Sequence, residues 1–195
     1  MRAVAIGDRL PARASLRPAA VAGLAVGVLG AISLALRPVG WGGVGATAAI
    51  GLIAVAAAPT RASGPSPVTR VGRSSPVPVL AVGLLAVLAS RAAGAPIPGP
   101  ASAVAIGASL AAAMAEEALF RGVLHGALQR LGAGVVVAIG VPAALFALVH
   151  VPGYGAGSLP VNLAAGLLLG WQRHASGTWA VPAATHGAAN LILYL

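Results

Sequence analysis

The carboxylates of this chain are concentrated at one position in an apolar sequence. Its 195 residues contain three acidic side chains, and two of them, Glu116 and Glu117, are adjacent. Arg121 follows Glu117 by four residues, the spacing at which two side chains meet on one face of a helix. Ionisable groups inside a membrane are costly and are therefore candidates for function. We expect Glu117 to pair with Arg121 as a support, and Glu116 to act as a general base.

Two further residue pairs, each with a histidine, have the same spacing on later hydrophobic segments. They are Phe146 with His150, and His186 with Asn190. An imidazole beside a carboxylate can activate water, and a second imidazole with an amide can stabilise the oxyanion of a tetrahedral intermediate. The set therefore contains the groups that hydrolysis through such an intermediate needs.

The composition predicts a membrane protein. Hydrophobic residues make up 58% of the chain and charged residues 8%, against about 45–50% and 25% in soluble domains. The net charge of +9 comes from arginines spread singly over short loops, which favours membrane topology and not a nucleic-acid partner. The absence of cysteine excludes disulfides, thiolate catalysis and Cys-ligated metals.

We therefore expect an all-α fold, a polytopic integral membrane helix bundle of about seven transmembrane helices within a range of six to eight. Residues 1–18 form a basic cytoplasmic tail, followed by a retained first span and not a cleaved signal peptide. Residues 19–100 hold N-terminal helices with a basic Pro/Ser loop at 59–76, and residues 101–195 hold the catalytic core. The expected spans are 19–36, 39–58, 77–93, 101–129, 132–150, 159–172 and 178–195, with a loop at 151–157.

The arginines favour one orientation of these spans. With the N-terminus in the cytoplasm, inside segments hold nine arginines and outside segments only Arg37 and Arg91, as the positive-inside rule requires. We expect an integral protein of a bacterial cytoplasmic membrane. At about 1.5 Å per residue, Glu116 and His186 come to similar depths, whereas a straight fifth span carries His150 to the outer edge.

In chain order, these motifs resemble the three signatures of the CPBP family, the CAAX proteases and bacteriocin-processing enzymes, also called Abi-type intramembrane proteases. This family includes the CAAX prenyl endopeptidase. The resemblance covers about residues 101–195, and the first hundred residues match only as generic spans. The motifs are Glu116-Glu117-x-x-x-Arg121, Phe146-x-x-x-His150 and His186-x-x-x-Asn190.

The resemblance implies an intramembrane endopeptidase that hydrolyses a peptide bond of a membrane-associated peptide or protein. Glu116 and His150 would activate the attacking water, and His186 and Asn190 would form the oxyanion hole. The favoured mechanism requires no cofactor. The alternative is a divalent metal such as zinc, held by Glu116, His150 and His186. The supporting residues are Glu117, Arg121 and Phe146.

Two other functions use the same residues differently. One is a proton- or ion-coupled transporter with Glu116 and Glu117 as carriers, which the small size and the absence of an internal repeat disfavour. The other is a catalytically inactive scaffold or immunity membrane protein, which the completeness of the polar set disfavours. Outside this set, we expect His125 to be exposed at the interface and His174 to be solvated in a loop.

Overall fold

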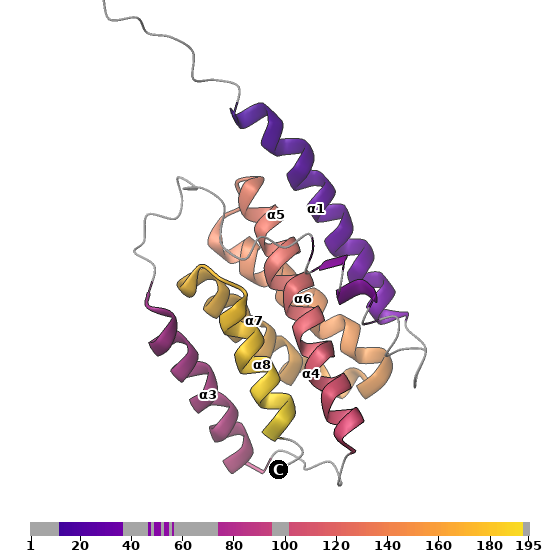
Figure 1. Cartoon of the computed structure of the whole chain (residues 1–195), viewed down its shortest axis with the longest axis vertical. Helices are drawn as coiled ribbons and strands as arrows, with labels where there is room; N and C mark the ends of the chain where they lie inside the picture. The colour runs from indigo at the N-terminus through magenta and orange to yellow at the C-terminus, as the bar shows by residue number, and fades with distance from the viewer. Residues whose placement is uncertain are drawn as a thin grey trace, which may run out of the picture.

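The computed structural model describes residues 12–36, 74–94 and 102–192, with residues 47, 49–51, 53, 54 and 56 (Figure 1). Every regular element within this part of the chain is a helix, which confirms the all-α class. The elements are α1 (Ala12–Ala35), α3 (Pro76–Ala92), α4 (Ala103–Glu117), the π-helix η1 (Ala118–Leu124), α5 (His125–Arg130), α6 (Val135–Tyr154), the 3-10 turn η2 (Ala156–Ser158), α7 (Leu159–Ser176) and α8 (Ala180–Ile192).

Within the described part of the chain, three helical segments are long and apolar enough to cross a membrane, which fits the predicted membrane bundle. They are Pro18–Ala35, Ala103–Arg130 and Val135–Tyr154. Large apolar side chains such as Leu29, Val77 and Val136 are exposed on the outside of the bundle. Helices that are apolar all round belong in a lipid environment or in a protein core. The exposed apolar surface therefore suits contact with lipid.

The segment with the two carboxylates is one uninterrupted helix of 28 residues, formed by α4, η1 and α5. Ser102 caps its start, because the hydroxyl accepts a hydrogen bond from the backbone N–H of Ala105 at 3.2 Å. Gly132, at φ +86°, follows its end in a conformation that glycine adopts without strain. This extent agrees with the predicted span 101–129.

Several predicted boundaries are wrong. The first helix begins at Ala12, inside the predicted tail of residues 1–18, while its candidate membrane span, Pro18–Ala35, lies close to the predicted span 19–36. Helix α6, which corresponds to the predicted fifth span, includes Pro152 and continues to Tyr154, into the predicted loop at 151–157. Helix α7, which corresponds to the predicted sixth span, continues to Ser176, and Gly177 at φ 73° ends it. Most of the predicted second span, most of the loop at 59–76 and residues 193–195 lie outside the described residues.

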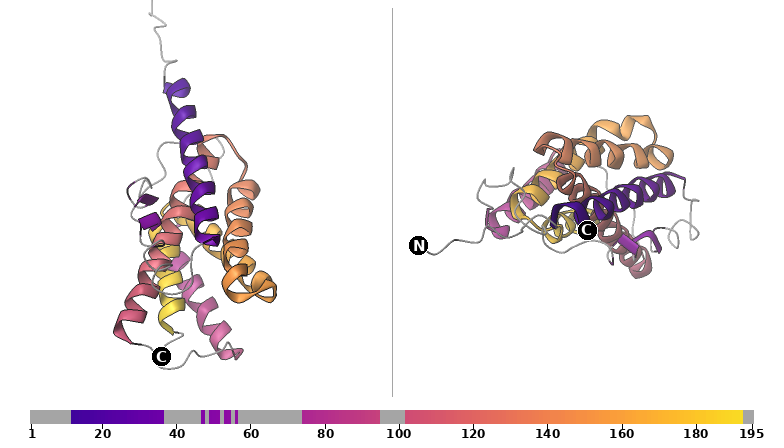
Figure 2. Two further views of the ribbon diagram at one scale, coloured as in Figure 1. Left: turned by 90° about the vertical axis from the view of Figure 1, so that its right-hand side faces the viewer. Right: turned by 90° about the horizontal axis from the view of Figure 1, so that it is seen from above.

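The helices pack around the long α4–η1–α5 segment. Helix α1 lies along η1, α5 and α6, and α8 packs against α3, α4 and α7 (Figures 1 and 2). Helices α6 and α7 form a close antiparallel pair, because a Cβ on Gly166 would lie 2.9 Å from the Cα of Ala143. Helix α7 also contacts η1, the continuation of the carboxylate-bearing helix.

Candidate active site

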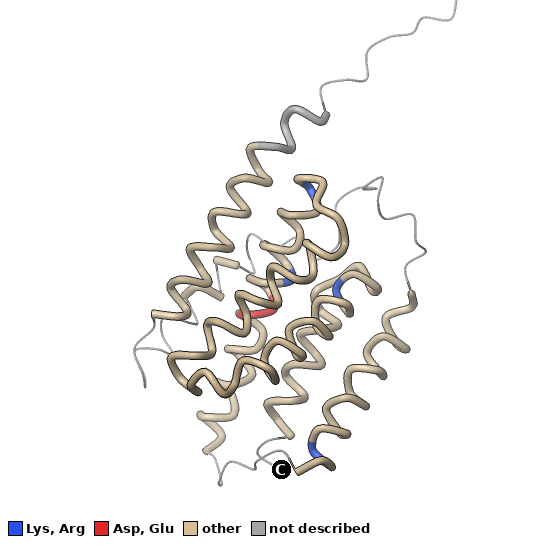
Figure 3. Tube along the Cα trace, turned by 180° about the vertical axis from the view of Figure 1, so that it is seen from behind, with Lys and Arg blue, Asp and Glu red and all other residues tan. Residues whose placement is uncertain are grey.

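The two adjacent carboxylates are buried in the middle of the bundle. Glu116 is 4% exposed and Glu117 is 0% exposed, and the acidic segment lies midway along its helix (Figure 3). The Oε1 atom of Glu117 accepts a hydrogen bond from Nη1 of Arg121 at 2.7 Å. The predicted ion pair between these residues is therefore confirmed.

The helix changes type directly after the carboxylates. Residues Ala118–Leu124 form a π-helix, and all seven of them are buried. π-helical turns inside α-helices are rare and frequently mark functional sites. Arg121 lies in this segment, and its Nη2 donates to the carbonyl oxygen of Gly166 on α7 at 3.0 Å. Its guanidinium thus joins Glu117 to the neighbouring helix.

His186 contacts Glu117 directly. Its Nδ1 lies 3.0 Å from Oε1 of Glu117, the same oxygen that Arg121 contacts. Glu117, predicted to brace Arg121, therefore also contacts His186, which the prediction had assigned to Glu116. Glu116 and Glu117 project in directions about 100° apart, and α8 lies on the side of Glu117. Because a carboxylate accepts hydrogen bonds, the proton lies on Nδ1, and Nε2 remains for a ligand.

His150 lies beside Glu116. Its Nδ1 is 2.7 Å from the carbonyl oxygen of Phe146, and a carbonyl can only accept, so this nitrogen carries the proton. Its Nε2 is 3.8 Å from Oε2 of Glu116. That distance is too long for a direct hydrogen bond and suits a bridging water.

The predicted depth of His150 is wrong for a geometric reason. The helix that carries Glu116 continues to Arg130 and turns directly into α6 at Val135. Measured from this turn, Glu116 and His150 lie about 21 and 22 Å along their helices. The two side chains therefore reach the same level of the bundle.

Phe146 lies between the two imidazoles. Its ring centroid is 4.6 Å from that of His150 and 5.6 Å from that of His186. The Cζ atom of Arg121 lies 4.7 Å from the same centroid, within the range of a cation–π contact. Phe120 packs edge-on against the ring at 5.6 Å. Phe146 therefore fixes the spacing of the charged and imidazole groups.

Asn190 lies one turn after His186 on α8. Its Nδ2 donates to the carbonyl oxygen of Ser109 on α4 at 3.1 Å. A primary amide has two N–H donors, so this contact leaves a second hydrogen for a ligand. The structure thus brings six of the seven predicted residues into one connected cluster, and holds Asn190 against α4 beside it.

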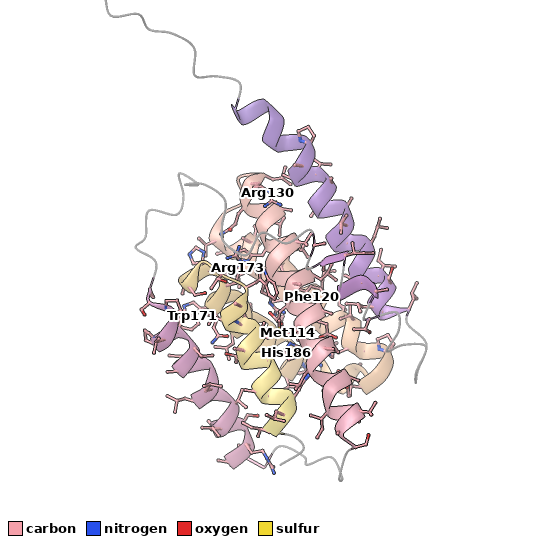
Figure 4. All side chains as sticks on the ribbon, viewed as in Figure 1. Met114, Phe120, Arg130, Trp171, Arg173 and His186 are labelled. Atoms are coloured by element: carbon pink, nitrogen blue, oxygen red, sulfur yellow. The ribbon has the colours of Figure 1, made fainter. Side chains whose placement is uncertain are left out.

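Two buried polar residues of α7 were missed in the sequence. Gln172 and Arg173 are 0% and 2% exposed, and Figure 4 labels Arg173 among the helices of the bundle. The predicted span 159–172 ends before Arg173, whereas α7 continues to Ser176 and includes it. Polar residues within an apolar helical run were the signal that could have identified them.

The expectations for the other two histidines are wrong. His125 is 1% exposed and lies in α5, not at an exposed interface. His174 lies in the last turn of α7 and is partly buried. Neither histidine contacts the cluster around Glu117 through a hydrogen bond among the described residues.

The candidate metal ligands do not converge. Among the described residues, no group of three or more His, Asp or Glu side chains is arranged to hold a metal ion. His186 turns Nδ1 toward Glu117, whereas His150 lies beside Glu116. The geometry of these donors does not fit a shared metal site.

The C-terminal half of the chain is similar to a known protein family. Residues 98–192 match a family described as type II CAAX prenyl endopeptidase, Rce1-like. This segment includes every proposed site residue and excludes α1 and α3. No curated protein and no solved structure matches the chain.

Proposed function

Because residues 98–192 belong to the Rce1-like family of type II CAAX prenyl endopeptidases, we propose that this integral membrane protein hydrolyses a peptide bond of a membrane-associated substrate. One observation carries the proposal. Glu116 with His150, and Glu117 with His186, form two adjacent carboxylate–imidazole pairs from three different helices. This arrangement can supply a nucleophile on one side of a carbonyl and charge stabilisation on the other.

In the proposed mechanism, Glu116 and His150 hold the attacking water between them. The protonated Nδ1 of His150 leaves the Nε2 lone pair directed toward Glu116. A water between Nε2 and Oε2 donates its hydrogens to both atoms and keeps a lone pair for the carbonyl carbon. Glu116 takes the proton as the bond to carbon forms, and later delivers it to the leaving amine.

His186 and Asn190 stabilise the oxyanion in this proposal. A second proton on His186 makes its Nε2 a donor, and the charge that this adds lies next to the carboxylate of Glu117. The second N–H of Asn190 supplies another donor from the next turn of α8. Loss of one donor to an oxyanion typically slows an enzyme by about 10²–10³-fold.

The substrate and the orientation follow from the same proposal. The family description names prenyl endopeptidases, which suits a substrate anchored in the bilayer. We propose a membrane-associated peptide or protein, in a bacterial cytoplasmic membrane with the N-terminus inside. The positive-inside distribution of arginines supports this orientation.

The proposal is tested with purified protein in lipid vesicles and a lipid-anchored reporter peptide. We expect His150→Ala to lower cleavage by about 10²–10⁴-fold, and His186→Ala and Asn190→Ala by about 10²–10³-fold. Each variant should elute as a folded protein. Wild-type cleavage by all three variants would refute the assignment.

A further inference from the structure

Helix α7 supplies none of the proposed catalytic groups. It nevertheless makes side-chain hydrogen bonds to η1, which continues the helix of Glu116 and Glu117, and to α8, which carries His186. The contacts come from the adjacent residues Gln172 and Arg173, which are buried. Neighbouring residues of a helix point about 100° apart. The two side chains therefore leave α7 toward different partners.

Arg173 contacts the π-helix. Its Nε donates to the backbone carbonyl oxygen of Arg121 at 2.9 Å. In return, Nη2 of Arg121 donates to the carbonyl oxygen of Gly166 on α7. The two hydrogen bonds run in opposite directions between the same elements, so they resist both sliding and rotation of η1 on α7.

Gln172 contacts the histidine-bearing helix. Its Nε2 donates to Oγ1 of Thr185 at 2.9 Å and to the carbonyl oxygen of Val79 on α3 at 2.9 Å. Thr185 directly precedes His186 in α8. A Cβ at Gly83 of α3 would collide with both Gln172 and Thr185, so a close approach of the three helices surrounds this contact.

Hydrogen bonds between membrane helices contribute only modestly to stability. They are directional, however, and in an apolar surrounding no water replaces a lost partner. Their larger effect is on the relative placement of the helices they join.

We propose that Gln172 and Arg173 are positioning residues that fix the α4–η1 segment, with Glu116 and Glu117, relative to His186 on α8. The inference rests on the proposed function for its kinetic consequences. The hydrogen bonds that support it do not depend on that function.

The chain offers a matched control, because Gln129 and Arg130 repeat the same two residues in the last turns of α5. We expect Gln172→Leu and Arg173→Met to lower kcat by about tenfold to 100-fold through misalignment, with KM within about twofold. Gln129→Leu and Arg130→Met should leave both constants near wild type. Thr185→Ser keeps the hydroxyl acceptor and should keep the activity, whereas Thr185→Val should behave like Gln172→Leu.

A second readout is independent of catalysis. The chain has no cysteine, and a Cβ at Gly187 of α8 would lie 3.6 Å from Cδ2 of Leu110 on α4. Cysteines at these two positions report the register of the helices through their rate of oxidative cross-linking. We expect Gln172→Leu and Thr185→Val to slow cross-linking in folded protein, and Gln129→Leu to leave it unchanged.

The outcomes distinguish the positioning role of Gln172 and Arg173 from the proposed protease function. Unchanged cross-linking, with activity that follows only the folded fraction, would overturn the positioning role while leaving the protease assignment intact. Slowed cross-linking in a chain whose unsubstituted form cleaves no peptide would uphold the positioning role and refute the proposed function.

Discussion

At the scale of single residues, Glu117 has the most demanding environment. Its Oε1 contacts both Arg121 and His186, and the carboxylate is fully buried. Removing one partner of a buried ion pair leaves the other charge uncompensated. We therefore expect Glu117 to contribute to folding, and in the proposed mechanism to stabilise a positive charge on His186.

Glu117→Gln should reduce both stability and turnover. We expect a loss of about 3–5 kcal/mol in the free energy of unfolding, because Arg121 keeps its charge without a carboxylate beside it. Thermal denaturation in detergent measures this effect. Glu117→Gln/Arg121→Met removes both charges and should recover part of the stability but not the activity. If Glu117→Gln melts at the wild-type temperature, the ion pair has no structural role.

Phe146 should act through the placement of its neighbours. We expect Phe146→Ala to lower kcat by about 100-fold, because His150, His186 and Arg121 all lose the ring that spaces them. Phe146→Tyr preserves the ring and tests whether a polar tip is tolerated. A folded Phe146→Ala variant with wild-type kcat would show that the ring does not position these groups.

Chelation separates the two mechanistic alternatives. The donor geometry does not gather Glu116, His150 and His186 around one point. We expect cleavage to persist after exhaustive dialysis against a strong chelator, with no zinc found by elemental analysis of the active protein. Loss of cleavage that returns on addition of zinc would favour the metal alternative.

Among the elements, the close packing of α6 on α7 determines the position of the Gly166 carbonyl oxygen, which accepts a hydrogen bond from Arg121. Gly166→Leu should force the two helices apart, since even a Cβ at this position would lie 2.9 Å from Ala143. Overpacking of this kind costs about 1–3 kcal/mol. We expect lower folded yield and lower activity together, measured by size-exclusion chromatography and peptide cleavage. Gly140→Leu on α6 is the control, because a Cβ there meets no atom within 4 Å.

The elements also explain what could be predicted from the sequence. The Glu117–Arg121 pair follows from helical spacing alone, because both residues lie on one helix. The contact of His186 with Glu117 depends on how α8 packs against α4, which no local pattern specifies. The depth of His150 depends on where α6 begins relative to the end of the carboxylate-bearing helix at Arg130, and the apolar pattern of each span alone does not specify that point.

In the whole molecule, helices from outside the segment that matches the family pack against that segment. Helix α1 covers η1 and α5, and Ala31 and Leu34 of α1 belong to the same buried core as Leu119 and Phe120. Helix α3 contacts α7 and α8 through Val79 and Gly83. The N-terminal helices therefore complete the core that holds the site.

Residues 98–192 expressed alone should fail to form a folded, active protein. The reason is that the core side chains of α1 and the acceptor on α3 would be missing. Co-expression of residues 1–97 as a separate fragment should restore a complex that copurifies and cleaves peptide. A folded and active 98–192 fragment would contradict this dependence on the N-terminal helices.

If Glu116 activates water for peptide hydrolysis, the turnover of purified Glu116→Gln in lipid vesicles should fall sharply. This change keeps the shape of the side chain and removes its basicity. Asp8→Asn, which neutralises the third acidic residue of the chain, is the matched control. We predict that Glu116→Gln lowers turnover by about 10²–10⁴-fold at unchanged folded yield, while Asp8→Asn cleaves like wild type. Equal turnover of Glu116→Gln and wild type would contradict the account.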